Sequence, residues 1–382
     1  MTASTHNVDV VVGDMFEASA QTLVNTVNCV GVMGKGVALE FKKRFPAMYE
    51  DYVGRCERGE VKLGRPYLYR NPEPPHVLNF PTKDHWRSVA RLKDIVAGLE
   101  YLEAHYREWG ITSLAVPPLG CGQGALDWHT VGPTLYERLG RLDIPVALYA
   151  PFDTPHAELT PRYLQRTLAS NGSSDDVPHE RRLQPGCVAL AAALEELLSD
   201  PHHWPIGKTS FHKLAYFLTA AGVPTGLEFE RGTYGPYAAG LTRVISTLVN
   251  NDLLRESRLG SRMIELKLGN TFDDARVAYE HELIEWQQEI HRAADLLARM
   301  KTHDAEIAAT VHLVASEIAA ATGETATDET ILAEVMEWKH RKRPPLREDE
   351  VLNAIHSLAM LGWLQVAHSE RTRIDEAALV GF

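Results

Sequence analysis

The sequence is poor in cysteine and shows no metal-binding spacing. Only four of its 382 residues are cysteine, at positions 29, 56, 121 and 187, and none forms a Cys-x-x-Cys pair. This argues against a disulfide framework and against a zinc site. The seventeen histidines show no His-Glu-x-x-His or similar spacing, so we assign no metal and no cofactor.

The chain also lacks a long apolar run. No stretch approaches the roughly 18 apolar residues that a membrane-spanning helix needs. The first residues have neither the basic nor the apolar segment of a secretory signal. We therefore expect a cytoplasmic protein with no membrane partner. Its composition, 45% hydrophobic and 24% charged, is typical of a globular protein, and its length favours two or three domains.

The net charge of −12 is distributed unevenly along the chain. Residues 1–155 hold 16 Lys+Arg and 18 Asp+Glu, whereas residues 156–382 hold 23 and 33. The nearly neutral first part can meet a polyanion through local basic patches. The acidic second part should repel nucleic acid and suits a basic partner.

Residues 1–155 alternate between short β-branched runs and amphipathic segments. Strands are expected at residues 8–12, 22–27, 67–69, 77–80, 113–116 and 146–149, and helices at residues 37–45, 88–107 and 130–139. This alternation predicts an α/β domain of three layers with a mixed, largely parallel sheet. Residues 170–178 have the composition of a linker, and we place the linker at residues 156–184.

From residue 185 onward the pattern becomes helical. Helices are expected at residues 188–198, 211–221, 241–254, 283–300 and 305–320. Residues 228–234 and 263–268 are expected to form a small hairpin or wing. We therefore predict a second, mainly helical α+β domain over residues 185–382.

Two glycine-rich loops each follow a predicted strand and precede a predicted helix. They cover residues 28–36 and 119–126. Such loops present backbone N–H groups and the positive end of a helix dipole to an anion, and glycine allows the backbone to lie close to a ligand. Their spacing matches neither the dinucleotide fingerprint nor the P-loop. Because ligands of parallel sheets bind beyond the carboxyl ends of the strands, we expect the two loops to clamp a diphosphate.

An acidic residue, Asp14, follows the first strand in the sequence Gly13-Asp14. A carboxylate at this position can accept a hydrogen bond from the exocyclic amino group of adenine. The alternative is a turn or helix-cap residue, and the position alone does not decide between them.

Together these residues resemble the ADP-ribose site of a macrodomain. The resemblance rests on Gly13-Asp14, Asn25-x-x-Asn28, residues 31–36 and Gly120-x-Gly-x-Gly-x-Leu126. Residues 30–36 and 79–86 more closely resemble the DarG family, the macrodomain antitoxins of DarT–DarG toxin–antitoxin systems. The second half resembles this family more loosely, through residues 212–218 and 234–238, in a pattern that is similar to other antitoxin domains.

The resemblance implies a DNA ADP-ribosyl glycohydrolase. Such an enzyme hydrolyses the N-glycosidic bond between ADP-ribose and thymidine in single-stranded DNA, and so repairs the DNA. Its C-terminal domain binds and neutralises a DarT-like toxin, a DNA ADP-ribosyltransferase. Two alternatives stay open: an ADP-ribose reader without turnover, and a glycohydrolase that acts on ADP-ribosylated protein.

The resemblance also implies roles for individual residues. Asp14 would bind adenine, with Met15 beside it and Tyr149 flanking the ring. Asn28 would hold the distal ribose, and Asn25 would brace its loop. In the first glycine loop, Gly34, Lys35, Gly36 and Val37 would wrap the α-phosphate side. In the second, Gly122, Gln123, Gly124 and Ala125 would donate to the β-phosphate, and Gly120, Cys121 and Leu126 would also belong to the ADP-ribose-binding residues. Cys29 and Cys121 are interpreted as small loop residues rather than nucleophiles, since neither has an evident base nearby.

Lys83 is the catalytic candidate. Taken alone, it would be interpreted as a surface lysine, but the resemblance places a functional lysine here. An amine whose pKa is lowered by desolvation can attack the anomeric carbon, and the alternative is that its charge acts on the leaving base. The related terminal ADP-ribose glycohydrolase has an acidic residue where this chain has Gly124. Whether Asp84, His85 or Asp127 assists Lys83 is therefore left open.

Three further residues near Lys83 are candidates for contacting the DNA strand. Trp86 could stack on a base, and Arg87 and Lys93 could pair with phosphates. A solvated helix face is the simpler account of each one taken separately.

Overall fold

The computed structural model describes residues 7–165, 183–201, 203–259, 263–298 and 300–367. The segment of linker composition, residues 170–178, lies outside the described residues. The chain divides into two compact units, one comprising residues 1–183 with 242–252 and the other residues 184–241 with 253–382.

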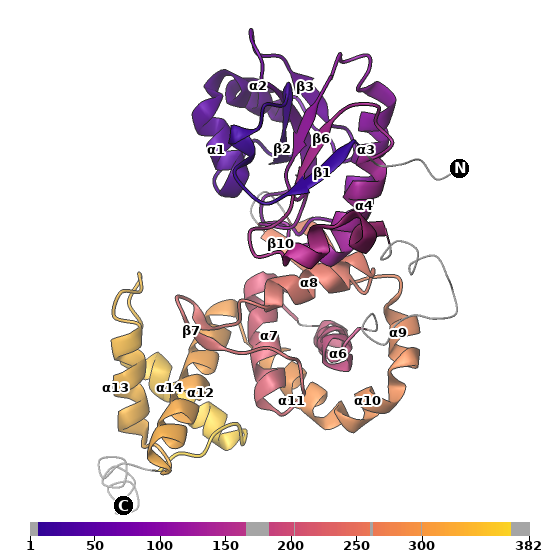
Figure 1. Cartoon of the computed structure of the whole chain (residues 1–382). Helices are drawn as coiled ribbons and strands as arrows, with labels where there is room; N and C mark the ends of the chain where they lie inside the picture. The colour runs from indigo at the N-terminus through magenta and orange to yellow at the C-terminus, as the bar shows by residue number, and fades with distance from the viewer. Residues whose placement is uncertain (1–6, 166–182, 202, 260–262, 299, 368–382) are drawn as a thin grey trace, which may run out of the picture. The chain divides into compact units, whose positions relative to one another are not determined.

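A six-stranded sheet forms the centre of the first unit (Figure 1). Its strand order is β1-β6-β5-β2-β4-β3. Its strands are β1 (Val8–Val11), β2 (Thr22–Asn28), β3 (Tyr67–Tyr69), β4 (His76–Lys83), β5 (Leu114–Val116) and β6 (Val146–Tyr149). Only β3 runs antiparallel to its neighbour, and all other neighbouring pairs are parallel. The mixed, largely parallel sheet predicted from the sequence is confirmed.

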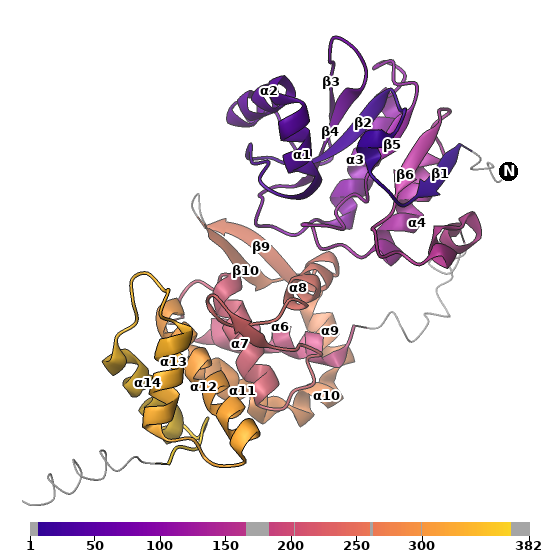
Figure 2. The ribbon, with the colours of Figure 1, turned by 60° about the vertical axis from the view of Figure 1, so that its left-hand side comes forward.

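The central strands bury both of their faces, because successive residues point to opposite sides of a sheet. Leu23 and Val77 belong to one buried cluster, and their neighbours Val24 and Leu78 to another. Helices cover both faces, as Figure 2 shows: α1 (Gly36–Arg44) and α2 (Pro46–Glu57) on one, and α3 (Leu92–His105) and α4 (Trp128–Leu139) on the other. This is the predicted three-layer arrangement, although α2 was not predicted.

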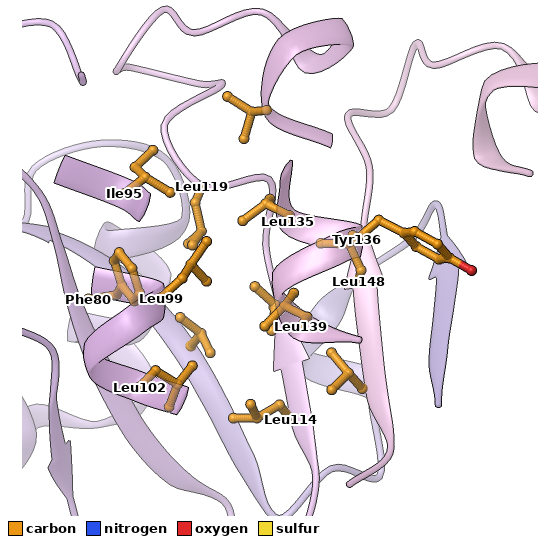
Figure 3. Close-up of a cluster of buried hydrophobic side chains, with 14 of the residues drawn as sticks. Phe80, Ile95, Leu99, Leu102, Leu114, Leu119, Leu135, Tyr136, Leu139 and Leu148 are labelled. Atoms are coloured by element: carbon orange, nitrogen blue, oxygen red, sulfur yellow. The ribbon is translucent and has the colours of Figure 1, made fainter. Parts of the chain in front are cut away.

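The larger cluster joins α3 and α4 to the sheet, and its side chains fill the layer between them (Figure 3). Packing here is tight at Gly98 of α3, where an added Cβ would lie 2.4 Å from Cζ of Phe80. Only glycine allows α3 to lie this close to β4. The same cluster includes Leu164, which is fully buried, so the first unit continues past residue 155, through the short 3-10 helix η2 (His156–Leu159).

Beyond residue 183 the elements are mainly helices, as predicted. They are α6 (Pro185–Ser199), α7 (Lys208–Ala220), α8 (Leu241–Asn250), α9 (Phe272–Ala278), α10 (Glu280–Glu285), α11 (Gln287–Ala298), α12 (Thr302–Thr322), α13 (Asp328–Trp338) and α14 (Glu348–Met360). Among the described residues, no helix combines the length and the apolar character needed to cross a membrane.

The strands of this part differ from the prediction. Residues 263–268 do form a strand, β10 (Met263–Leu268), but it pairs with β9 (Leu254–Leu259). The other predicted segment contributes β7 (Glu230–Gly232), which pairs with β8 (Gly235–Tyr237). The prediction that residues 228–234 and 263–268 pair with each other in one small hairpin is therefore wrong. The helix predicted for residues 241–254 is also too long, because α8 ends before Leu254, which begins β9.

Candidate functional site

Five parallel strands end at one edge of the sheet in the first unit, and the predicted site residues follow these ends. In sheet order, this edge carries Asp14 after β1, Tyr149 at the end of β6, the second glycine loop after β5, the first glycine loop after β2, and Lys83 at the end of β4. The fold thus brings together segments that lie far apart in the sequence.

The backbone of the second glycine loop turns tightly on itself. Gly120 and Ala125 have positive φ angles, +81° and +60°, and the Leu126 amide donates to the Gly120 carbonyl at 3.0 Å. A Cβ on Gly124 would lie 2.4 Å from the Gly120 carbonyl oxygen and 2.7 Å from Cβ of Ala90. Gly122, by contrast, has open space beside it. The loop therefore requires glycine at position 124 for its own packing.

The acidic residue after this loop, Asp127, serves as a helix cap. Its Oδ1 accepts a hydrogen bond from the backbone amide of His129 at 2.9 Å, at the start of α4. Burial, together with the charge of Asp127, raises the pKa of the Cys121 thiol to about 12. A thiol that stays protonated is a poor nucleophile, which agrees with its interpretation as a loop residue.

Asn28 holds the first glycine loop in shape. Its Oδ1 accepts hydrogen bonds from the backbone amides of Val30 at 3.0 Å and Val32 at 3.3 Å, and its Nδ2 donates to the Val32 carbonyl at 2.6 Å. The hydroxyl of Tyr52, on α2, donates to the Asn28 carbonyl at 2.8 Å. Sequence reasoning missed Tyr52, because α2 itself was not predicted.

The remainder of this loop leads directly into α1. Gly34, Lys35 and Gly36 are exposed, and α1 begins at Gly36 with a φ of +57°. Val37 is the second residue of the helix and is half-buried. The first turn of α1 therefore directs its backbone N–H groups to the same edge as the loop, which is the arrangement that favours an anion.

Asn25 lies beneath the loop rather than at its surface. It is fully buried, and its Nδ2 donates to Oδ1 of Asn79 on β4 at 2.9 Å. The same nitrogen lies 3.9 Å from the sulfur of Met33, which belongs to the loop. The structure therefore gives Asn25 a supporting position, while most of the loop's bracing comes from Asn28.

Lys83 is the last residue of β4, and its amine reaches the second glycine loop. Nζ donates hydrogen bonds to the carbonyl of Gln123 at 2.6 Å and to the carbonyl of Trp86 at 3.2 Å. In the β2–β4 ladder, Lys83 is the register partner of Asn28. The amine therefore reaches from the end of β4 toward the second glycine loop rather than away from it.

The two residues after Lys83 are held by the backbone. The Asp84 carbonyl accepts from the Cys29 amide at 3.2 Å, which ties the end of β4 to the start of the first loop. His85 is buried, its Nδ1 accepts from the Arg87 amide at 3.2 Å, and its ring packs 5.4 Å from that of Trp86. His85 thus has the packing role that its position beside Trp86 suggests.

At the other end of the edge, Asp14 caps the short helix η1 (Met15–Glu17). Its Oδ1 accepts from the Phe16 amide at 2.9 Å, and Oδ2 lies 4.0 Å from the Arg44 guanidinium. Tyr149 lies near this end, since a Cβ added to Gly13 would lie 4.0 Å from Cε1 of its ring. Burial, together with the charge of Asp14, raises the pKa of its hydroxyl. Met15 is buried in the core of the unit and offers only its backbone to this end.

No group of three or more His, Cys, Asp or Glu side chains suited to a metal ion occurs within the described ranges. The groups available at the edge include backbone amides, the Lys83 amine and the Asp14 carboxylate.

Comparisons with known proteins identify the first unit. The Macro domain family model matches residues 24–135. Over 308 residues the chain is 37% identical to the DNA ADP-ribosyl glycohydrolase of Thermus aquaticus, covering 78% of this chain and 80% of that protein. It is 38% identical over 238 residues to the Mycobacterium tuberculosis protein of the same name, covering 59% and 62%.

Two solved structures are also similar. The macrodomain of Mycobacterium tuberculosis DarG is 46% identical and covers 38% of this chain and 97% of that one, with a TM-score of 0.37. Thermosipho africanus DarTG in complex with ADP-ribose is 41% identical and covers 42% and 46%, with a TM-score of 0.40. Because the match to the Thermus aquaticus protein extends over most of both sequences, the chain belongs to the DNA ADP-ribosyl glycohydrolase (DarG) family and contains a macrodomain.

Proposed function

We propose that this protein removes ADP-ribose from thymidine bases in single-stranded DNA by hydrolysing the N-glycosidic bond. We further propose that it neutralises a DarT-like toxin through residues 185–382, with the macrodomain in residues 1–155 and its packing continuing to Leu164, so that the connection is shorter than the expected residues 156–184. The relatives named DNA ADP-ribosyl glycohydrolase support this activity.

The observation that carries the proposal is the order of groups along the sheet edge. Asp14 and Tyr149 come first, then the two glycine loops, then Lys83. ADP-ribose presents its parts in the same order: adenine, diphosphate and distal ribose. An adenine at the Asp14 end and a diphosphate between the loops bring the anomeric carbon to the Lys83 end.

In this proposal the two loops bind the diphosphate through backbone amides, with the first turn of α1 adding its dipole. The Lys83 amine then attacks the anomeric carbon as the bond to the thymine nitrogen breaks. The thymine nitrogen takes up the proton that the neutral amine loses on forming the new C–N bond, and water subsequently releases ADP-ribose and returns a proton to the amine. The Lys83 contact with Gln123 supports this assignment, since it keeps the amine beside the diphosphate loop.

The test is a turnover assay on an oligonucleotide that carries one ADP-ribosylated thymidine. We expect Lys83→Ala to lower kcat by at least about 100-fold while it still binds ADP-ribose, because the loops are unchanged. If the parent protein binds ADP-ribose without any turnover, it is a reader. If it acts on ADP-ribosylated protein and not on DNA, the DNA substrate is wrong.

The toxin-binding proposal rests on charge and on one relative. Residues 156–382 carry 33 Asp+Glu against 23 Lys+Arg, which suits the basic surface of a DNA-binding enzyme. A relative from Thermosipho africanus, 41% identical over 180 residues, is named as a fusion of a DNA ADP-ribosyl transferase and a DNA ADP-ribosyl glycohydrolase. A transferase encoded beside this protein is the expected partner.

The experiment is co-purification of the full-length Lys83→Ala protein with that transferase. Because this variant is expected to lack turnover, any protection of DNA must come from binding. We expect a stable complex that blocks DNA modification and weakens as salt is raised. Unhindered DNA modification in the presence of excess variant would rule out neutralisation by binding.

A further inference from the structure

The turn after β4 carries an exposed tryptophan next to the proposed catalytic amine. Trp86 is 45% exposed, whereas Trp128 of the same unit is 6% exposed. The Trp86 carbonyl accepts a hydrogen bond from Nζ of Lys83 at 3.2 Å, so the two residues are directly connected. Burial of a tryptophan ring contributes a large favourable free energy. We therefore interpret an exposed ring beside a site as a surface that a ligand covers.

The residues around Trp86 hold the turn in one shape. His85 is buried, and its carbonyl accepts from the Ser88 amide at 3.0 Å while its Nδ1 accepts from the Arg87 amide at 3.2 Å. The His85 ring also packs against Trp86, with the centroids 5.4 Å apart. The tryptophan is thus supported from beneath by a buried side chain, which reduces the entropy that a ligand would lose on ordering it.

A cation accompanies the ring. The guanidinium carbon of Arg87 lies 4.5 Å from the centroid of Trp86. An aromatic face together with an arginine is the combination by which proteins bind single-stranded nucleic acid, because bases stack on the ring and the guanidinium pairs with phosphate. A protein substrate offers neither a row of bases nor a regular row of phosphates.

We infer that Trp86 and Arg87 form the docking surface for the DNA strand next to the modified thymidine. A neighbouring base displaces the Arg87 guanidinium from the face of Trp86 and stacks there, and Arg87 then contacts the backbone phosphate beside that base. This inference rests on the proposed function, since it requires the modified base to lie at Lys83. These contacts would explain why the protein acts on a DNA strand rather than on a free nucleoside.

The experiment compares two substrates: ADP-ribosyl-thymidine as a nucleoside, and the same group within a short single-stranded oligonucleotide. We expect Trp86→Ala to lower kcat/KM roughly 10- to 100-fold further on the oligonucleotide than on the nucleoside, the effect of losing one stacked base. Trp86→Phe should restore most of the difference. Trp204→Ala, which removes a 52% exposed tryptophan of the second unit, is the control and should change neither value.

Arg87→Gln should reduce the slope of log affinity against log salt for the oligonucleotide by about 0.7, the effect of one lost phosphate contact. Equal losses on both substrates in Trp86→Ala would overturn the docking surface and leave the proposed function intact. A parent protein that turns over neither substrate would overturn the proposed function. In that case, fluorescence anisotropy with an unmodified oligonucleotide tests whether Trp86 binds DNA. The docking surface is wrong if the Trp86→Ala protein binds the oligonucleotide as tightly as the parent.

Discussion

Asn28 and Lys83 face each other at the ends of β2 and β4, and an irregularity in the ladder brings them together. Val27 pairs with Pro81, but the next residue, Asn28, pairs with Lys83, so that Thr82 is passed over. Such a bulge shifts the alternation of side chains by one residue. Thr82 is buried instead, and its hydroxyl lies 3.4 Å from the Val27 carbonyl. The residue that braces the first loop and the proposed catalytic amine are therefore neighbours.

The chemical role of Lys83 can be tested with arginine at this position. Arginine keeps the positive charge, but its guanidinium cannot lose a proton and attack a carbon. We expect Lys83→Arg to lose at least about 100-fold in kcat, as Lys83→Ala does. The measurement is single-turnover release of ADP-ribose from the modified oligonucleotide. Substantial activity in Lys83→Arg would instead favour the alternative in which charge acts on the leaving base.

The packing of the second glycine loop yields a stability prediction. Gly124→Ala places a Cβ 2.4 Å from the Gly120 carbonyl oxygen, so the loop must move. We expect the free energy of unfolding of the first unit to fall by about 1–3 kcal/mol, the usual effect of overpacking. Gly122→Ala is the matched control, because nothing lies within 4 Å of its added Cβ. Thermal unfolding should separate the two variants, and equal melting temperatures would contradict this packing.

A buried lysine organises one hairpin of the second unit. Nζ of Lys213 donates to the carbonyls of Tyr234 at 2.6 Å and Pro236 at 3.1 Å. Burial lowers the pKa of Lys213 to about 8, although the charge of Glu306 partly offsets this. Lys213→Met should destabilise the second unit by about 2–3 kcal/mol, because both carbonyls lose their donor in a buried place.

The control for this variant is Lys267→Met, which removes a half-exposed lysine paired with Glu265 at 3.1 Å. Because the Lys267 ammonium is exposed to solvent, although Glu265 is buried, we expect this pair to contribute no more than about 1 kcal/mol. Urea unfolding monitored by tryptophan fluorescence compares the two variants. A smaller loss for Lys213→Met than for Lys267→Met would show that the hairpin does not depend on the buried amine.

The second unit should lose stability in mild acid. Burial lowers the pKa of His212 from 6.5 to about 4, and burial also lowers that of His312. The unfolded chain therefore takes up protons at these positions before the folded chain does. The contribution of His212 is full above about pH 6.5 and falls as the pH drops toward 4, by up to about 1.4 kcal/mol per pH unit, and His312 adds a loss in the same direction.

Urea unfolding at pH 7, 6, 5 and 4.5 measures this slope. The His212→Phe variant keeps an aromatic ring for the stack with Tyr237, whose centroid lies 5.3 Å away, but cannot be protonated. We expect a shallower dependence on pH in this variant. An unchanged slope would mean that His212 does not contribute.

Local patterns predicted most of the first unit. Runs such as residues 22–27 have the β-branched composition of buried strands, and the glycines at positions 120, 122 and 124 indicated the loop that packs against α3. Knowing that parallel strands end at one edge was sufficient to expect that both loops lie together. These predictions depend only on short stretches of sequence.

The features that were missed depend on residues far apart in the chain. Tyr52 supports Asn28 from α2, and no local signal links the two. The Lys83 contact with Gln123 depends on the order of β4, β2 and β5 in the sheet, which a single sequence does not give. The pairing of β9 with β10 was not predicted for the same reason, since the sequence pattern of one strand does not indicate which strand it pairs with.

The position of Lys83 on β4, near one end of the strand order, has a consequence for how long polymers are handled. In the proposed reaction the adenine lies at the opposite edge strand, β1, and the diphosphate at the inner strands, while the bond to be broken lies near β4. In the proposed reaction a long DNA strand would therefore not have to thread through the protein, and it would depart as soon as the bond breaks. The small sugar nucleotide would leave last, which makes it the natural inhibitor of the next round.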